Sequence, residues 1–318
     1  MSSIETIFLT ALVPVFFGLG LGYYAGHRGR VDNRNVAALN VTLMHFVLPC
    51  SLFLGVGRTP PAVLRSQFPL LAILGIAMIA IYALAFLLER KVFRKSSSEA
   101  SVQALTVSFS NNVAVGLPLL SSLFGASGLL AVAAAIVAGV LIISPITLVL
   151  LEYNADAENN ARPLLKRLGP AMLASIRRPV ILAPVCALIF PITGHLLPAS
   201  AAQTLDLVGK ATTGLALFLT GLILSAQAVK VSSGVACGVL LKNIAQPALV
   251  VLLVFLFHQH GEIAREAVLL AAVPAGFFGT VFGSRYGVSS ADASSTLVFS
   301  TLASIITLPI AITLCGHL

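Results

Sequence analysis

Charged residues are scarce in this sequence. Lys, Arg, Asp and Glu together make up 9% of its 318 residues, whereas they make up about 25% of an ordinary soluble domain. Hydrophobic residues account for 58%, and the mean hydropathy is +1.01. This composition excludes a soluble globular domain and indicates an integral membrane protein whose main partner is the lipid bilayer.

Cysteines are few, and the motifs of common enzymes are missing. The four cysteines show no C-x-x-C spacing and lie in apolar runs, which predicts packing residues rather than disulfides or metal ligands. The sequence lacks the Walker A motif of an ATP-driven pump and shows no Ser-His-Asp or metal-ligand grouping. We therefore expect no enzymatic activity, no metal and no cofactor.

The apolar residues form ten windows, each long enough to cross a bilayer as a helix of about 20 residues. The predicted spans are 4–26, 36–57, 67–90, 101–124, 126–151, 179–198, 203–229, 233–258, 264–287 and 292–315. The first window has no basic segment before it and no small-residue cleavage site after it, so we interpret it as a retained helix.

Basic residues give the protein a net charge of +8, and they collect in alternate loops. Fourteen of the nineteen Lys and Arg residues lie between 27 and 34, between 90 and 95, between 162 and 178, or at Lys230 and Arg285. No aromatic and basic recognition patch accompanies them, so they do not indicate a nucleic-acid partner. The positive-inside rule predicts that these loops are cytoplasmic and that both termini lie outside.

The stretch from 108 to 125, SFSNNVAVGLPLLSSLFG, combines membrane-spanning character with helix-breaking residues. Asn111 and Asn112 are adjacent amides in apolar surroundings, and Gly116 and Pro118 follow them. Because proline lacks a backbone donor and blocks the carbonyl four residues back, we expect the helix to kink or unwind here. Unsatisfied backbone groups are tolerated at membrane depth only beside protein or water, so this span should line a cavity.

A second stretch, 271 to 283 or AAVPAGFFGTVFG, has the same character, with Pro274, Gly276 and Gly279. Two interrupted spans in corresponding halves of a chain are typical of the binding site of a secondary transporter.

Three landmarks recur at about half the chain length. Phe53 in PCSLFL and Phe218 in GLALFL are 165 positions apart, Pro145 and Pro309 are 164 apart, and the Phe-Gly pairs at 124–125 and 282–283 are 158 apart. This predicts an internal duplication. With five spans per copy, the second copy enters the membrane upside down. We assign residues 1–155 to the first inverted repeat, 156–178 to a cytoplasmic linker and 179–318 to the second inverted repeat.

Two polar groups in the predicted spans suggest binding of a carboxylate. The N-terminal ends of half-helices offer free backbone donors and a partial positive charge, and Asn111 and Asn112 would add amide donors. The alternative is that these amides satisfy the unwound backbone. Lys242, in LLKNIAQP, is a cation deep in an apolar run. It would bind the substrate or a broken helix, or its long side chain would extend to an interface.

Coupling to an ion is predicted less sharply. His45 lies within a span, and its ordinary pKa makes it a candidate for proton coupling, although a neutral histidine bonded between helices is the alternative. Carboxylates are nearly absent from the predicted spans. This weakens a sodium site built on Asp or Glu, although backbone carbonyls at a helix break could still bind that ion. H+ is therefore a possible coupling ion, and Na+ is the less favoured alternative.

Several motifs resemble the auxin efflux carrier family, and within it the bacterial malonate permeases. They are VDNRNVAALN, HFVLPCSLF, SNNVAVGLP, TTGLALFLTGLILSA, LLKNIAQP, AGFFGTVFGSRYGVSSADA and ITLPI, which together span nearly the whole chain. The resemblance implies an all-α protein of ten transmembrane helices in two inverted five-helix repeats, with crossing broken helices 4 and 9, as in sodium/proton antiporters and bile-acid transporters. It also implies elevator-type alternating access, homodimers and a bacterial cytoplasmic membrane.

By motif position, the resemblance also implies a site. Asn111 corresponds to the asparagine that binds the substrate carboxylate, Pro118 and Pro274 to the crossover prolines, and Pro49 with Ser51 to one wall. We add four further candidates for substrate binding: Asn112, Gly116, Gly276 and Thr280, with Lys242 as above. The chain departs from malonate permeases in having His45 at a position that is acidic there, and Asn-Asn where they have Asn-Tyr.

The sequence thus predicts a secondary carrier of small carboxylate anions such as malonate. Two alternatives stay open: an exporter of indole-acetate or another monocarboxylate, and a membrane sensor that binds without transport.

Overall fold

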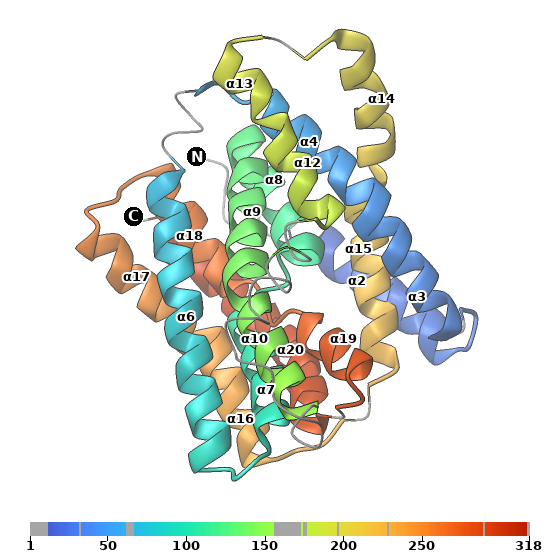
Figure 1. Ribbon diagram of the computed structural model, residues 1–318, viewed down its shortest axis with the longest axis vertical. Coiled ribbons are helices and arrows are strands. Elements are labelled where there is room, and N and C mark those ends of the chain that lie inside the picture. Colours follow the sequence, from blue (N-terminus) through green and yellow to red (C-terminus); the bar gives the residue numbers. More distant parts are fainter. Residues whose placement is uncertain are drawn as a thin grey trace.

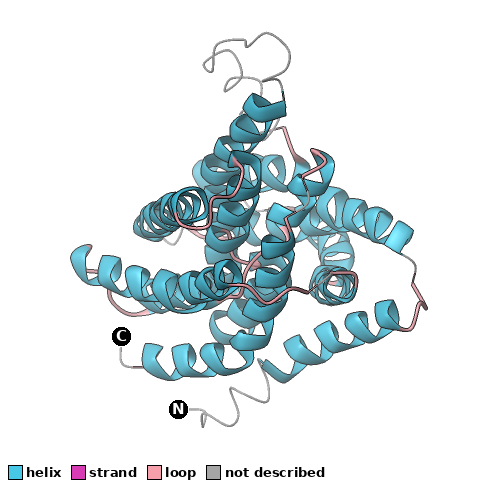
Figure 2. Ribbon diagram, turned by 90° about the horizontal axis from the view of Figure 1, so that it is seen from below, coloured by secondary structure: helices cyan, strands magenta, loops and turns pink. Residues whose placement is uncertain are grey.

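The computed structural model describes residues 12–31, 33–61, 67–155, 173, 177–195, 197–227, 229–288 and 290–316. Within these ranges the regular secondary structure is helical, and no β-strand is formed (Figure 2). Six helical stretches are long and apolar enough to cross a membrane, which agrees with a multi-pass membrane protein. They are Val36–Gly57, Phe68–Lys91, Ala126–Leu151, Ala199–Ser225, Ser233–Leu256 and Ala291–Cys315.

Helices of the first half follow the predicted windows to within several residues (Figure 1). They are α2 (Val13–His27), α3 (Asn33–Thr42), η2 (Leu43–Val47), α4 (Leu48–Gly57), α6 (Phe68–Lys91), α7 (Ser97–Ser108), η3 (Asn112–Gly116), α8 (Leu117–Phe124), α9 (Ala126–Ala138), η4 (Gly139–Ile143) and α10 (Ser144–Ala155). The beginning of the first predicted window, up to residue 11, and most of the predicted linker lie outside the described residues.

The helices of the second half also follow the predicted windows to within several residues. They are α12 (Pro179–Ala187), α13 (Ile189–Thr193), α14 (Ala199–Gly209), α15 (Ala211–Ser225), α16 (Ser233–Leu240), η5 (Leu241–Ala245), α17 (Gln246–Leu256), α18 (Glu262–Ala272), α19 (Phe278–Arg285) and α20 (Ala291–Cys315). Figure 1 shows the turn between α6 and α7 and the connection from α15 to α16 at one end of the molecule, and the α13–α14 connection at the other.

Both predicted interruptions are present, but proline does not cause the first one. Helix α7 ends at Ser108, Phe109 is extended with φ −100° and ψ 106°, and η3 begins at Asn112. Pro118 lies instead in the first turn of α8, which continues directly from η3, so that the helix runs on through the proline. The second interruption runs from Val273 to Phe277 and does contain Pro274. The predicted interruption is therefore present, but it lies before Asn112 and not at Pro118, where the helix widens into η3 and continues.

The π-helical segments η2, η3, η4 and η5 explain how such prolines are accommodated. Each of η2, η3, η4 and η5 is followed, two residues after its end, by a proline. These prolines are Pro49, Pro118, Pro145 and Pro247. A π-turn is wider than an α-turn, so it relieves the clash between the proline ring and the preceding carbonyl. The helix axis therefore continues through each proline.

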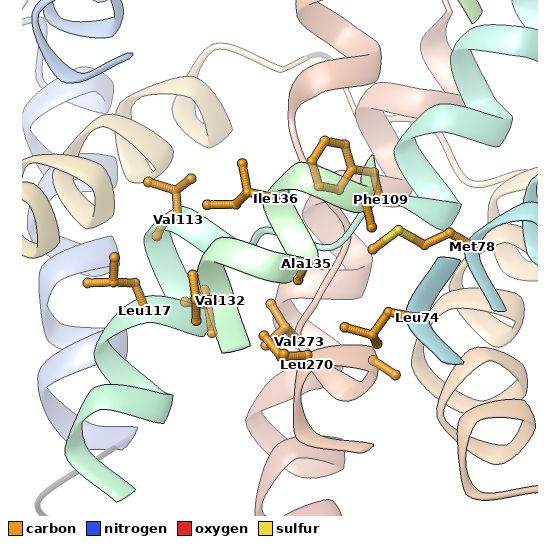
Figure 3. Packing of buried hydrophobic residues seen from close by; sticks show 14 of the residues in the cluster. Leu74, Met78, Phe109, Val113, Leu117, Val132, Ala135, Ile136, Leu270 and Val273 are labelled. Atoms are coloured by element: carbon orange, nitrogen blue, oxygen red, sulfur yellow. The ribbon is translucent and has the colours of Figure 1, made fainter. Parts of the chain in front are cut away.

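Two helix pairs pack closely on one flank of the molecule. Helix α2 packs against α15, and α4 packs against α12 (Figure 1). A Cβ atom at Gly22 of α2 would lie 2.0 Å from the carbonyl oxygen of Phe218 in α15, so glycine allows the two backbones to touch. The hydrophobic core includes Phe109, Val113, Ile136, Leu270 and Val273, which come from both halves of the chain (Figure 3).

Candidate functional site

The two interrupted segments meet where each leaves its helix. Ser110 and Ala275 form an isolated antiparallel bridge. The amide of Asn111 donates to the carbonyl of Pro274 at 2.9 Å, and the amide of Gly276 donates to the carbonyl of Phe109 at 2.9 Å. The backbone groups freed by each interruption are therefore satisfied by the other, which makes the crossing stable in an apolar interior.

Glycine permits this close approach. A Cβ atom at Gly276 would lie 2.4 Å from the carbonyl oxygen of Phe109, and one at Gly279 would lie 2.0 Å from Oγ1 of Thr106. Helix α19 can therefore lie directly on α7. Gly276 and Gly279 of GFFGTVFG are thus explained by the close approach of this segment to α7 and Phe109.

Asn111 has a structural task at the crossing. Its side chain is buried, and Oδ1 accepts a hydrogen bond from the amide of Ala114 at 3.3 Å, which caps the start of η3. Its Nδ2 lies 3.5 Å from Oγ1 of Thr220 in α15, at the limit of a hydrogen bond. Oδ1 of Asn111 thus satisfies a backbone amide next to the interruption, as the alternative interpretation of this side chain predicted.

Asn112 differs from its neighbour. Its side chain is 2% exposed, and neither Oδ1 nor Nδ2 has a hydrogen-bond partner. It lies over Gly116, where a Cβ atom would be 3.4 Å from Oδ1 of Asn112 and 3.6 Å from Leu270. A buried polar group without a partner costs about 1–3 kcal/mol. Such a group in a native structure calls for a specific explanation, such as a ligand that completes it.

Lys242 is fully buried and holds the ends of both interrupted helices. Its Nζ donates to Oγ of Ser110 at 2.5 Å, to Oε1 of Gln246 at 2.6 Å and to the carbonyl of Ala271 at 3.0 Å. Nε2 of Gln246 in turn donates to the carbonyl of Ser108 at 2.9 Å. Of the roles considered for Lys242, contact with the broken helices is observed, and extension to an interface is not.

A second polar chain supports the other interruption. The amide of Ala275 donates to Oγ of Ser300 at 2.9 Å, and Ser300 donates to Oδ1 of Asn243 at 2.6 Å. Nδ2 of Asn243 donates to the carbonyl of Ser300 at 3.1 Å. Helix α20 and segment η5 thus fix the backbone of the second interruption from one side.

A cavity of about 710 Å³ opens next to α19. Its polar lining includes Asn40, Gln227, Thr280, Ser284 and Ser290, and no charged side chain of the described residues lines it. Oδ1 of Asn40 is buried and has no hydrogen-bond partner. Of the residues predicted for the site, Thr280 lies in this cavity, at the end of the molecule that carries the connection from α15 to α16.

Three other predicted residues lie elsewhere in the structure. His45 is exposed on η2, Pro49 is buried in α4, and Ser51 packs against α14, where a Cβ atom at Gly209 would lie 3.1 Å from its Cα. None of the three lines the cavity. The structure therefore brings Asn111, Asn112, Gly116, Pro274, Gly276 and Lys242 to one crossing, and it places Pro49 and Ser51 in α4, outside the lining of the cavity.

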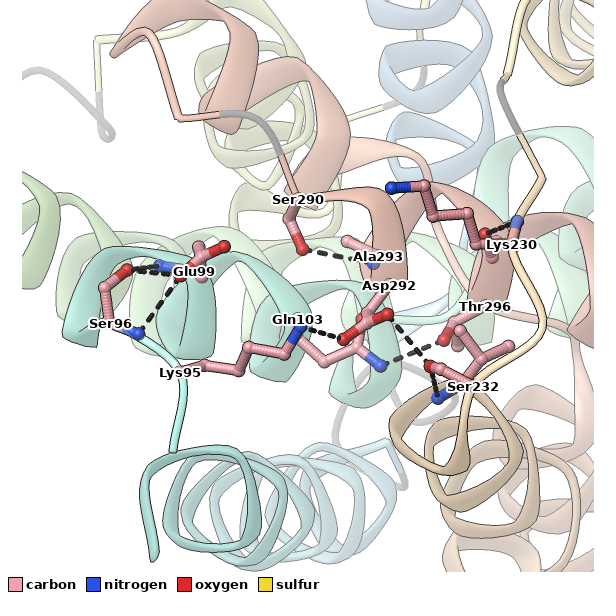
Figure 4. Close-up of polar contacts among 12 residues, drawn as sticks. Lys95, Ser96, Glu99, Gln103, Lys230, Ser232, Ser290, Asp292, Ala293 and Thr296 are labelled. Atoms are coloured by element: carbon pink, nitrogen blue, oxygen red, sulfur yellow. Dashed lines mark hydrogen bonds and ion pairs between the residues drawn. The ribbon is translucent and has the colours of Figure 1, made fainter. Parts of the chain in front are cut away.

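Buried carboxylates are the main feature that the sequence did not indicate. Glu266 in α18 is fully buried and accepts from Oγ of Ser127 at 2.8 Å and from Nε2 of Gln67 at 3.3 Å. At the other end, Asp292 accepts from Ser232 at 3.0 Å and pairs with Lys95 at 2.7 Å (Figure 4). In the sequence, Glu266 and Asp292 stand out only by lying near the ends of predicted apolar windows. Burial of a carboxylate cannot be inferred from such a position.

Comparisons with known proteins give a consistent result. A family model described as membrane transport protein matches residues 7–312. The chain is 27% identical over 308 residues to the uncharacterized transporter YfdV of Escherichia coli strain K12, covering 96% of each chain. It is 26% identical over 302 residues to a putative malonate transporter of Rhizobium meliloti, covering 94% of this chain and 93% of the relative. It is 23% identical over 330 residues to auxin efflux carrier component 5 of Arabidopsis thaliana, covering 93% of each.

Proposed function

We propose that this chain, which belongs to the membrane transport protein family, carries small organic carboxylate anions across the membrane through the crossing of its two interrupted helices. Family membership confirms the predicted resemblance to auxin efflux carriers and makes the chain a membrane transporter rather than an enzyme. The substrate, the path and the mechanism are the proposal.

The unpartnered amide of Asn112 carries the proposal. Its Nδ2 is a buried donor next to the start of the η3–α8 half-helix, whose first amides and dipole favour an anion. A carboxylate oxygen bound there would accept from Nδ2 and remove the cost of the unpaired group. Because Asn112 has no fixed charge, a bound anion could also be released.

The architecture that we propose is two inverted repeats of five spans, and the crossing supports it. Ser110 and Ala275, which form the bridge, are 165 positions apart, the spacing of the PCSLFL and GLALFL motifs. The residue 165 positions after Asn111 is Gly276, and the residue 165 positions before Pro274 is Phe109. The hydrogen bond from Asn111 to Pro274 therefore has the bond from Gly276 to Phe109 as its counterpart in the other half. Oγ1 of Thr212 likewise donates to the carbonyl of Val47, 165 positions away.

Packing supports a further element of the proposal, elevator-type movement of one domain against a scaffold. The first and seventh predicted spans pack together as α2 and α15, and the second and sixth pack together as α4 and α12. In two repeats of five spans, the first span corresponds to the sixth and the second to the seventh. The α2–α15 pair is therefore the counterpart of the α4–α12 pair. We propose that these four helices form the scaffold, that the protein is a homodimer in a bacterial cytoplasmic membrane, and that both termini lie outside.

Two candidate substrates follow from different observations. Malonate is the first, because a relative over nearly the whole chain is described as a putative malonate transporter. A monocarboxylate with an apolar body, such as indole-acetate, is the second, because no charged side chain of the described residues lines the cavity and a second carboxylate would lack a partner there.

Counterflow in proteoliposomes tests the proposal. Vesicles loaded with unlabelled malonate or indole-acetate should accumulate the labelled compound, and Asn112→Leu should abolish this exchange while retaining a folded protein. Thr204→Ala is the control and should exchange normally, because Thr204 is an exposed residue of α14. Binding without exchange would indicate a sensor, and normal exchange by Asn112→Leu would exclude the proposed site.

A further inference from the structure

Lys242 is a fully buried lysine without a carboxylate partner among the described residues. Its three neighbours are a hydroxyl, an amide oxygen and a backbone carbonyl, all of them uncharged. A buried ammonium with no compensating anion is strongly disfavoured in an apolar interior. The charge on Lys242 therefore depends on whether an anion arrives nearby.

The hydrogen bonds around Lys242 suit either protonation state. Oε1 of Gln246 must accept, because Nε2 of the same amide donates to the carbonyl of Ser108. The carbonyl of Ala271 can only accept. Oγ of Ser110 can accept from an ammonium, or it can rotate its proton and donate to the lone pair of a neutral amine. The same geometry thus satisfies three donors in the charged form, and two donors and one acceptor in the neutral form.

Charged and titratable groups on the surrounding elements leave Lys242 without a fixed counterion. Segment η5 packs against α6, α7, α16, α17, α18 and α20. The described acidic residues on these helices are Glu89, Glu99, Glu262, Glu266 and Asp292. Glu266 is bonded to Ser127 and Gln67, Asp292 to Lys95 and Ser232, and Glu99 to Ser96. Glu89 lies beside Gly234, where a Cβ atom would be 3.4 Å from its Oε1, and Glu262 lies at the first turn of α18.

The remaining titratable groups of those helices do not supply a negative charge. Arg90 and Lys91 end α6, and Arg265 lies in α18. Tyr82 is hydrogen-bonded to Thr147. The free thiols on these helices are Cys237 and Cys315. What favours a charge on Lys242 is the partial negative charge at the ends of α7 and α18, whose carbonyls face Lys242 and Gln246.

We propose that Lys242 is the proton-coupling residue of the carrier, and that it takes up one proton when a carboxylate binds at the crossing and releases it when the carboxylate leaves. This inference rests on the proposed function and replaces His45, which is exposed on η2, as the coupling candidate. Ser110, which Lys242 contacts directly, precedes Asn111 and Asn112 in the same interruption. Charge at Lys242 and anion at Asn112 therefore stabilise one another.

The step is balanced in charge and atoms. A proton from the water on the side of entry adds to the lone pair of the neutral amine, and the ammonium charge offsets the single negative charge of a bound monocarboxylate. The loaded site is then neutral, which lowers the cost of moving it through the bilayer. On release, the ammonium returns its proton to water on the opposite side, so that one proton travels with each carboxylate.

Proton uptake by the purified wild-type protein tests the linkage without any variant. Indole-acetate and malonate are added in weakly buffered detergent solution with a pH indicator, while the extent of binding is followed by thermal shift. We expect about one proton taken up per bound indole-acetate, and an affinity that falls about tenfold per pH unit where the free lysine is neutral. Saturable binding with no proton uptake and no pH dependence would overturn the inference and leave the carrier intact.

Two variants identify the residue. Lys242→Arg keeps a charge that does not titrate, and it should bind without proton uptake and with an affinity independent of pH. His45→Gln should take up protons like the wild type. Proton uptake by Lys242→Arg, or its loss in His45→Gln, would assign the coupling elsewhere. Failure of every probe to bind or exchange would instead overturn the proposed function, and the inference with it.

Discussion

The backbone amide of Asn111 donates to the carbonyl of Pro274 at 2.9 Å, joining two residues 163 positions apart at the point where neither helix continues. The reciprocal bond from Gly276 to Phe109 closes the pair. Each interruption would otherwise expose unsatisfied backbone in an apolar interior. The two halves of the chain therefore form this crossing together, and each supplies a partner for a backbone group that the other leaves free.

Replacing Gly276 by alanine should disrupt the crossing. The added methyl would lie 2.4 Å from the carbonyl oxygen of Phe109, and a backbone atom fixed by a hydrogen bond cannot move aside. We expect a loss of about 1–3 kcal/mol, typical of overpacking, or a loss of folded protein. Thermal unfolding in detergent measures this. Gly214→Ala is the control, because nothing lies within 4 Å of its added methyl, and an equal effect of both variants would contradict the explanation.

Asn111 and Asn112 should separate stability from binding. Asn111→Ala removes the cap on Ala114 and should lower stability by about 1 kcal/mol. Asn112→Leu removes two unpartnered atoms and should leave the melting temperature unchanged or raise it. Differential scanning fluorimetry of the two variants checks the difference. A larger destabilisation by Asn112→Leu would show that its amide has a structural partner.

The sequence could predict that the helices in the stretches 108–125 and 271–283 are interrupted. It could not predict the exact position of the first break or the contacts that hold it open. Adjacent amides, glycine and proline in an apolar run marked both segments. However, Pro118 lies inside a helix because the wider turn of η3 accommodates it, and the interruption at 109–111 is held open by bonds to residues of the other half. The depth of Lys242 was also predictable. Its partner Ser110, which is 132 positions away, was not, because only the folded chain brings them together.

Glu266 should be an important structural carboxylate at the start of α9 and α6. Glu266→Ala would leave Ser127 without its 2.8 Å acceptor and Gln67 without its 3.3 Å acceptor, and should cost about 1–3 kcal/mol. Glu262→Ala is the matched control, since Glu262 is exposed and its distance to Ser127 is 3.4 Å. Chemical or thermal unfolding of both variants checks this, and comparable stabilities would mean that the buried carboxylate has no such role.

Lys95 should make stability depend on alkaline pH. Its hydrogen bond to Asp292 raises the pKa of the Lys95 ammonium above its usual value of 10.5. A raised lysine pKa stabilises the folded state below the unfolded pKa, and this contribution is lost as the pH rises through the folded pKa. Lys95→Met should therefore unfold at a lower temperature than the wild type at pH 8, and the difference should shrink above about pH 10.5.

Lys91→Met provides the control for Lys95, because Lys91 is an exposed lysine at the end of the preceding helix α6. Lys91→Met should have the same melting temperature as the wild type at pH 8 and at pH 11. A difference between Lys95→Met and the wild type that persists unchanged up to pH 11 would mean that the pair with Asp292 is not its source.

Three polar side chains that hold the interruptions have no polar counterpart in the other half of the chain. Lys242, Asn243 and Gln246 support the interruptions from η5 and α17, whereas the positions 165 residues earlier in α6 are Ala77, Met78 and Ile81. In the proposed alternating-access cycle the two halves of the chain exchange conformations. Apolar residues of α6 would then occupy the position that the ionisable Lys242 and its polar neighbours held before the exchange. Facing the cytoplasm and facing the exterior would then be states of unequal energy even with equal solutions on both sides, so that a resting carrier should favour one orientation.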